Sequence, residues 1–453
     1  MSLETANQFS LKPSMEKILQ LAKDQGIVQC EVLASKAKST SLKANEGKLD
    51  EYKISAPQIL GVRLIKDQKV GLAYSESSDD ESLKTLVKTA IENSQFSKTN
   101  LYEEIQENEK RSCTEDYYNS KEDVSLENMI QFTLDLEKTP LAMDKRVQSA
   151  PYNNLSNSTS EHMLLNSKGT ECYDKRNFYT CYTSALIKDG DQQAMHYYGM
   201  SSPNYNDLSV ETVSKESVLH AANFLEAKPL KSGSYDVIFD IDVLASLFGT
   251  FAIVTNGKQA QEGLNPWREK LSQEVIDSRI SLIDDPTLLK GYGYGLFDDE
   301  GTPTQRLPMI ENGTLKTFLH NSSTANYFKT KSTGHASRSA KSGLSITRSN
   351  LVITSSSSAD QDELYSGKLL KVISVQGLGS GSNPISGDFS FAASGYLLDN
   401  NEQTQVVKEV TISGNWYSIL KDQIGSIGNT QMMDSGRRTF SPEIRFTGLT
   451  VSG

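Results

Sequence analysis

Apolar residues recur at helical spacing in four segments of the first half of the chain. In the earliest segment, the residues on one helical face are Met15, Ile18, Leu19, Leu21 and Ala22. The second opens with Asp79-Asp80-Glu81, which suits the amino end of a helix because the free N–H groups there attract negative charge. The predicted helices are residues 14–25, 79–95, 125–139 and 208–227.

Residues between these helices show the alternation of apolar and polar side chains that is typical of β-strands. The alternating runs lie within residues 28–77 and 154–199, and turn signals separate them. Helices that accompany several consecutive strands favour an α+β arrangement, in which the helices pack on an antiparallel sheet.

The pattern changes after Pro229, which marks the clearest domain boundary. A buried-looking strand, Tyr235–Phe239, leads into one helix at about residues 241–256, and short strands with Gly and Ser turns follow. We therefore predict an α+β protein with two domains. Residues 1–229 form an N-terminal domain of helices on antiparallel strands, and residues 230–453 form a mainly-β domain.

The composition of the chain disfavours several classes of function and of cellular location. The 453 residues carry a net charge of −11, which repels polyanions and disfavours nucleic-acid binding. No stretch approaches the roughly 18 apolar residues of a membrane span, and the beginning lacks the apolar centre of a signal peptide. The four cysteines form no CxxC pair, which is typical of free thiols in a reducing compartment. We expect a cytoplasmic protein that binds neither nucleic acid nor membrane.

One acidic stretch is a candidate site. Asp298, Asp299 and Glu300 are adjacent, so in a strand their side chains alternate between faces and cannot all reach one metal ion. The spacing also differs from that of a calcium loop. Residues 301–320 continue with a turn and two alternating runs around Glu311-Asn312-Gly313, a hairpin signal. Spacing alone favours a solvent-facing acidic lead into a β-hairpin.

Other catalytic patterns are weak. No HExxH or HExxxH motif occurs, and the five histidines are too far apart for one helix, although a long-range pair such as His320 with His335 stays open. No GxSxG elbow is present. Ser380 lies in a Gly-rich loop without the GK[ST] of a phosphate loop, so backbone flexibility is the favoured interpretation.

Several motifs of the second half resemble those of the TldD/PmbA (TldD/TldE) family. They are DDEGTPTQRLPMIENGTLKTFLHNSSTANYF, KSTGHAS, ISGDFSFAASGYLLDNNEQTQVVKEVTISGN and LKDQIGSIGN, in this order. The resemblance covers most of residues 230–453, and it implies that the acidic segment leads into a core hairpin. It also implies one of two subunit types: TldD-like zinc peptidases with HExxxH and a later cysteine, or PmbA/TldE-like partners without them.

The residues at the expected zinc positions indicate the second type. Aligned on Leu247-Phe248, the HExxxH positions hold Gly249, Thr250 and Val254, and no cysteine follows Cys181. The resemblance therefore implies a PmbA/TldE-like subunit with no catalytic residue, metal or cofactor of its own, with zinc held only by a TldD-type partner. The region around residues 427–446 is shorter than is usual in the family, which leaves a partner surface there open.

Three functions remain open at this point. The favoured one is a non-catalytic subunit of a TldD/TldE-type metallopeptidase that helps to bind and enclose peptides for proteolysis by the partner. The alternatives are a stand-alone peptidase with an unrecognised site and a homodimeric peptide-binding or scaffold protein. Candidate residues for a peptide cleft are Arg306, His335, Gly377, Gly379 and Gly381.

Overall fold

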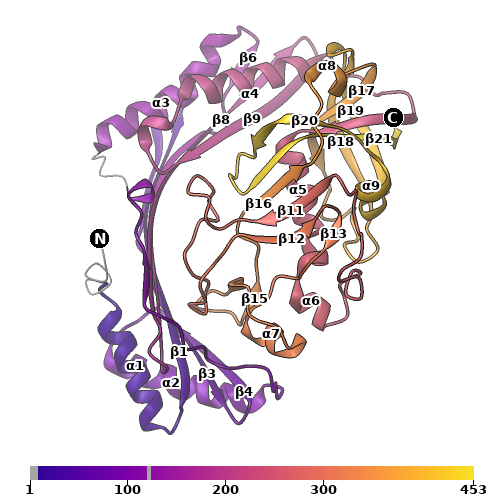
Figure 1. Ribbon diagram of the computed structural model, residues 1–453. Helices are drawn as coiled ribbons and strands as arrows, with labels where there is room; N and C mark the ends of the chain where they lie inside the picture. The colour runs from indigo at the N-terminus through magenta and orange to yellow at the C-terminus, as the bar shows by residue number, and fades with distance from the viewer. Residues whose placement is uncertain (1–8, 120–123) are drawn as a thin grey trace.

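Two large β-sheets dominate the computed structural model, which describes residues 9–119 and 124–453. Parts of the predicted N-terminal domain, residues 1–8 and 120–123, lie outside the described residues. The first sheet forms a long arc with helices at both ends, and the second half of the chain lies on its concave side (Figure 1). The fold is α+β, as the sequence predicts.

The first sheet has nine strands in the described residues, and its central path runs β4-β3-β1-β7-β8-β5. Two strands are unusually long: β1 has 17 residues and β8 has 19. They run along the arc between the pair of helices at one end and the pair at the other, and the concave side of the arc faces the second half of the chain (Figure 1). The strands are β1 (Gln29–Asn45), β2 (Lys48–Ser55), β3 (Gln58–Lys66), β4 (Lys69–Ser75), β5 (Arg111–Cys113), β6 (Val147–Ser149), β7 (Asn154–Asn166), β8 (Glu171–Asp189) and β9 (Gln192–Ser202).

Two pairs of helices bury their apolar faces on this sheet. α1 and α2 pack on β1, β3 and β4, and α3 and α4 pack on β1, β8 and β9. Side-chain caps fix where three of them begin: Asp79, Ser125 and Ser209 each accept a hydrogen bond from a free N–H of the first turn. The four predicted helices are confirmed with small shifts: α1 (Lys12–Asp24), α2 (Asp80–Phe96), α3 (Leu126–Met143) and α4 (Val210–Leu225).

The second sheet has ten strands in the described part of the chain, and β21 lies in its interior. β21 pairs with β10, β16, β19 and β20, and its pairing with β16 is parallel. The large apolar core of this half includes the buried Trp416 and Phe446. The strands are β10 (Gly233–Phe239), β11 (Ile280–Asp284), β12 (Leu307–Glu311), β13 (Thr314–Leu315), β16 (Leu351–Ser355), β17 (Lys368–Gln376), β18 (Asp388–Asp399), β19 (Glu402–Asn415), β20 (Ile424–Met433) and β21 (Thr439–Ser452); β14 (Ala336–Ser337) and β15 (Ser345–Ile346) form a separate pair.

Two local predictions in this half have different outcomes. The hairpin is confirmed: Glu311 pairs with Thr314, and Asn312 and Gly313 both have the positive φ of a tight primed turn. The single helix predicted for about residues 241–256 is wrong in length. α5 (Ile241–Thr250) has its C-cap at Phe251, and a 3₁₀ turn (Ala252–Thr255) follows. Asn256 then caps the next short helix, α6 (Gly257–Gln261). The remaining short helices are α7 (Ser322–Phe328), α8 (Gln361–Leu364) and α9 (Trp416–Asp422).

Candidate functional site

Two arginines meet where two parallel strands begin. β16 and β21 run in the same direction, with Leu351 opposite Thr439. Arg348 lies just before β16 and Arg438 just before β21, and the N–H of Leu351 donates to the carbonyl oxygen of Arg438 at 2.8 Å. Because parallel strands begin at the same edge of a sheet, both arginines lie at that edge.

The two arginines line two adjoining cavities, which we call the arginine cleft. The larger cavity, of about 310 Å³, reaches Ala252, Thr255 and Asn256 beyond the end of α5. The smaller, of about 200 Å³, reaches Arg176 on β8 of the first sheet. The cleft therefore connects the second half of the chain with the concave side of the arc. Both cavities are lined by Thr347, Arg348, Ser349 and Arg438.

Neither Arg348 nor Arg438 has an ion-pair or side-chain hydrogen-bond partner among residues 9–119 and 124–453. The nearest acids have other partners. Asp284 accepts from the N–H of Ser349 at 2.7 Å and lies 2.9 Å from Nε2 of His335. Asp434 accepts from the N–H groups of Arg438 at 2.7 Å and Thr439 at 2.6 Å. Burial lowers the pKa of both arginines, so their charges are incompletely compensated.

The acidic stretch of the sequence is buried, so the prediction that it faces solvent is wrong. Asp298 and Glu300 are 8% and 1% exposed. Oδ1 of Asp298 accepts from the N–H groups of Glu300 and Thr302, and its Oδ2 accepts from that of Ala336 at 2.9 Å. Gly301, at a positive φ of 78°, turns the loop so that these donors converge on one carboxylate. The spacing of the three acids in the sequence did not predict this turn, because it assumed that they lie in an extended strand.

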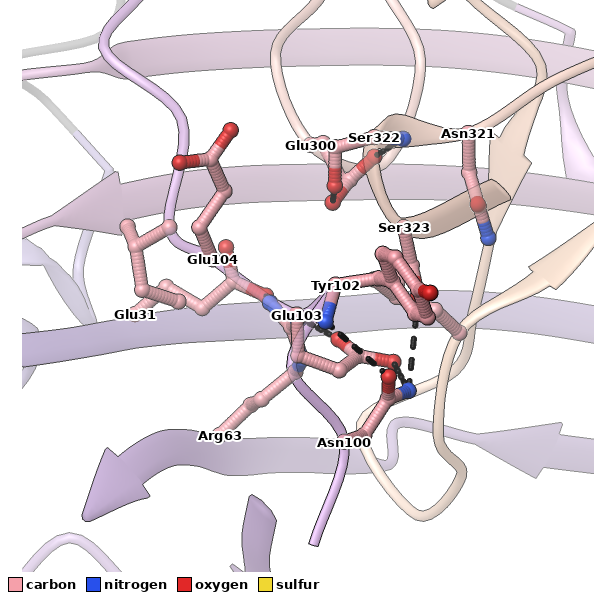
Figure 2. Close-up of polar contacts among 12 residues, drawn as sticks. Glu31, Arg63, Asn100, Tyr102, Glu103, Glu104, Glu300, Asn321, Ser322 and Ser323 are labelled. Atoms are coloured by element: carbon pink, nitrogen blue, oxygen red, sulfur yellow. Dashed lines mark hydrogen bonds and ion pairs between the residues drawn. The ribbon is translucent and has the colours of Figure 1, made fainter. Parts of the chain in front are cut away.

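Glu300 joins a buried charge network between the two halves, shown in Figure 2. It accepts from the N–H of Ser322 at 2.9 Å and from the Ser322 hydroxyl. On the sheet side, Arg63 pairs with Glu31 at 3.0 Å and with Glu103, and Arg338 of the second half also contacts Glu31, at 3.2 Å. Burial raises the pKa of Glu300 to about 7, partly opposed by Arg63 and reinforced by Glu31. The network is an interface between the halves rather than an open site.

Comparison with known proteins identifies the family. Three family profiles match in order: PmbA/TldA metallopeptidase domain 1 over residues 30–94, the central domain over residues 119–224 and the C-terminal domain over residues 232–453. The chain belongs to the PmbA/TldD metallopeptidase family.

Relatives of known name and structure match the PmbA/TldD chain over nearly its whole length. Metalloprotease PmbA of Escherichia coli O157:H7 is 23% identical over 437 residues, which are 94% of this chain and 92% of that protein. An uncharacterized protein of Methanocaldococcus jannaschii is 24% identical and covers 97% of this chain and all (100%) of that one. A putative modulator of a DNA gyrase from Thermotoga maritima has a TM-score of 0.86 at 25% identity, covering 98% and 100% of the two chains. TldE from Thermococcus kodakarensis has a TM-score of 0.85 at 22% identity, covering 97% and 100%.

Gly249, Thr250 and Val254, which we expect at the zinc-motif positions of TldD-like members, lie close in the chain to Ala252 and Thr255, which line the arginine cleft. Gly249 and Thr250 end α5, and Val254 is in the 3₁₀ turn that borders both the cleft and the core. The Thr250 hydroxyl donates to the carbonyl oxygen of Ser246 at 2.9 Å. The side chains of Gly249, Thr250 and Val254 are a hydrogen atom, a hydroxyl and an alkyl group. These are not the ligands that zinc prefers, which are imidazole, thiolate and carboxylate groups. In the described residues no group of three or more His, Cys, Asp or Glu is placed to hold a metal ion.

The cysteines are equally unsuited to metal binding here. All four are free, buried and located in the first half of the chain: Cys30, Cys113, Cys172 and Cys181. Burial raises the pKa of each thiol to about 12, which disfavours the thiolate that binds metal. Within the described residues, no helix is both long and apolar enough to cross a membrane.

Of the five cleft candidates predicted from sequence, the structure places only His335 in the arginine cleft. Both of its ring nitrogens have partners, since Nδ1 lies 2.8 Å from the Thr333 hydroxyl and Nε2 contacts Asp284. Arg306 is exposed and pairs with Asp285 at 3.4 Å. The glycines 377, 379 and 381 lie in the loop between β17 and β18, where a Cβ on Gly381 would come within 2.0 Å of the Ser390 carbonyl oxygen. The loop therefore needs Gly381 for its own packing.

Sequence reasoning missed Arg348 and Arg438. They occur in the unremarkable runs SITRSNL and SGRRTF, far apart in the chain. The available signal was weak: Arg438 comes directly before β21, and Arg348 lies three residues before the first residue of β16. Only the parallel pairing of β16 with β21 brings the two arginines to one edge.

Proposed function

We propose that this chain is the PmbA/TldE-type, non-catalytic subunit of a two-subunit metallopeptidase. In this role it binds and encloses extended peptides, and a TldD-type partner supplies the zinc that activates water. The observation that carries the proposal is the segment after α5. Gly249 and Thr250 end the helix, and Ala252 and Thr255 beyond it line a cavity that contains arginines instead of metal ligands.

The histidines give further support. His335 has both ring nitrogens occupied, and Nδ1 of the buried His320 lies 3.1 Å from the Thr324 hydroxyl. Burial, reinforced by His335, lowers the pKa of His320 to about 4, so this imidazole is neutral near pH 7. Neither ring is presented to a substrate as a general acid or base, which needs direct reach to the transferred proton. This disfavours the stand-alone peptidase.

Reconstitution with a partner tests the proposal. The chain is purified alone and together with an HExxxH-bearing family member, and zinc content and cleavage of an unstructured peptide are measured for each. We expect neither zinc nor cleavage from the chain alone, and zinc-dependent cleavage from the pair. Stoichiometric zinc with chelator-sensitive cleavage by the chain alone would contradict the proposal.

Matched variants locate the chemistry. Replacing the glutamate of the partner's HExxxH with glutamine should abolish cleavage by the pair, because that carboxylate is the expected base. Thr250→Ala in this chain should leave cleavage unchanged, since its hydroxyl is bonded only within α5. If Thr250→Ala alone stopped cleavage, this chain would contribute to the chemical step.

A further inference from the structure

The arginine cleft holds positive charge that its own walls do not neutralise. Arg348 is half-buried and Arg438 is exposed at the cleft, and neither has an ion-pair partner in the described part of the chain. Arg176, which lines the smaller cavity, differs because Asp174 pairs with it at 2.9 Å. The two unpaired guanidinium groups are thus the unusual feature, in a protein whose net charge is −11.

The acids around the cleft attract the two arginines, but in the described residues none of them forms an ion pair with either. Asp284 accepts from the backbone N–H of Ser349 and contacts His335, and Asp434 accepts from two backbone N–H groups. Asp298 and Asp299 line the smaller cavity, but both also accept backbone N–H donors, and burial raises their pKa. The partial burial of Arg348 without a paired anion is unfavourable, since arginines removed from water are normally paired. An anion from outside the chain would complete the arrangement.

We propose that Arg348 and Arg438 form a subsite for a carboxylate of the bound peptide. A guanidinium donates two parallel N–H groups to a carboxylate, and two guanidinium groups at one strand edge can hold both of its oxygens. The larger cavity, of about 310 Å³, lies at the lower end of the range of ligand pockets, roughly 300–1,000 Å³, so it suits a short peptide end or one side chain. This inference rests on the proposed peptide-binding function and names the chemical group that is recognised.

The carboxylate can come from the C-terminus of the peptide or from an Asp or Glu side chain. Three versions of one unstructured peptide distinguish these sources. The first has a free C-terminal carboxylate and no internal acid, the second has a C-terminal amide, and the third is the amide with one internal glutamate. Binding of each to the full chain is measured by calorimetry, alone and with the zinc-bearing partner.

We expect a carboxylate-bearing version to bind roughly tenfold or more tightly than the neutral amide, as charge-assisted hydrogen bonds predict. Arg348→Gln and Arg438→Gln should each remove that preference and leave binding of the amide unchanged. Arg268→Gln is the matched control, because Arg268 lies outside the cleft and pairs with Glu269 at 3.2 Å. It should keep the full preference.

Thermal unfolding without peptide separates a ligand-binding role from a structural one. Arg348 makes no ion pair that stabilises the folded protein, so Arg348→Gln should keep or raise the midpoint of thermal unfolding. A midpoint lowered by several degrees would show a structural role and overturn the inference. Equal binding of acid and amide by the unmodified chain would also overturn it, while the proposed function would stand. If no version bound, alone or with the partner, both would fail.

Discussion

Glu300 offers the sharpest test of the buried interface between the two halves. Its carboxyl is 1% exposed, and it faces a network in which Arg63 already has Glu31 and Glu103 as partners. Ionising a further acid in this position adds a negative charge that Arg63 compensates only in part. The perturbation is Glu300→Gln, which keeps the size of the side chain and an acceptor for the N–H of Ser322.

The magnitude follows from the pKa. The ordinary value of 4.5 is raised to about 7, because burial outweighs the attraction of Arg63. The folded protein therefore binds a proton that the unfolded chain releases between these values, and the free energy of unfolding falls as pH rises through this window. With about 1.4 kcal/mol for each pKa unit, Glu300 lowers the stability by about 3 kcal/mol between pH 4.5 and pH 7.

Urea unfolding at pH 5.5 and pH 8 measures the effect. The free energy of unfolding of Glu300→Gln should exceed that of the unmodified chain by about 1 kcal/mol at pH 5.5 and by about 3 kcal/mol at pH 8. Glu311→Gln is the control, since Glu311 is 55% exposed and should show little change at either pH. A Glu300→Gln variant that is destabilised equally at both pH values would refute the reasoning.

Three further predictions concern other buried positions. Gly301→Ala should lower the free energy of unfolding by about 2–4 kcal/mol in urea, because the residue has a left-handed φ and a Cβ there would lie only 2.6 Å from Thr170. Gly26→Ala is the control: Gly26 also has a positive φ but has open space around it, so this change should lower the free energy of unfolding by about 1 kcal/mol. The four thiols should not react with a disulfide reagent at pH 8 in the native state and should all react in guanidinium, since burial raises each pKa to about 12; a fast native reaction would contradict this. Burial lowers the pKa of His196 to about 4, so stability should fall as pH drops from 6.5 to 4, and His196→Asn should reduce that fall in urea unfolding.

Local sequence patterns predicted those parts of the fold that local chemistry determines. The helix beginning after Asp79 follows from its cap, and the turn at Asn312-Gly313 follows from residues that tolerate positive φ. The burial of Glu300 could not be predicted in this way, because it depends on strands β1 and β3, which are more than 200 residues away. The cleft formed by Arg348 and Arg438 could not be predicted for the same reason, because it depends on the pairing of β16 with β21.

The interior position of β21 has a consequence for how the protein is made. Val237 of β10 pairs with Phe446 of β21, and β16 pairs with β21 as well. During synthesis, β10 and β16 leave the ribosome long before β21, the strand that pairs with both. Contacts between residues so far apart in the sequence also form slowly. Their open edges are then free to pair with other chains. We expect the second half to depend on chaperones until translation has passed residue 452 and β21 can close the sheet.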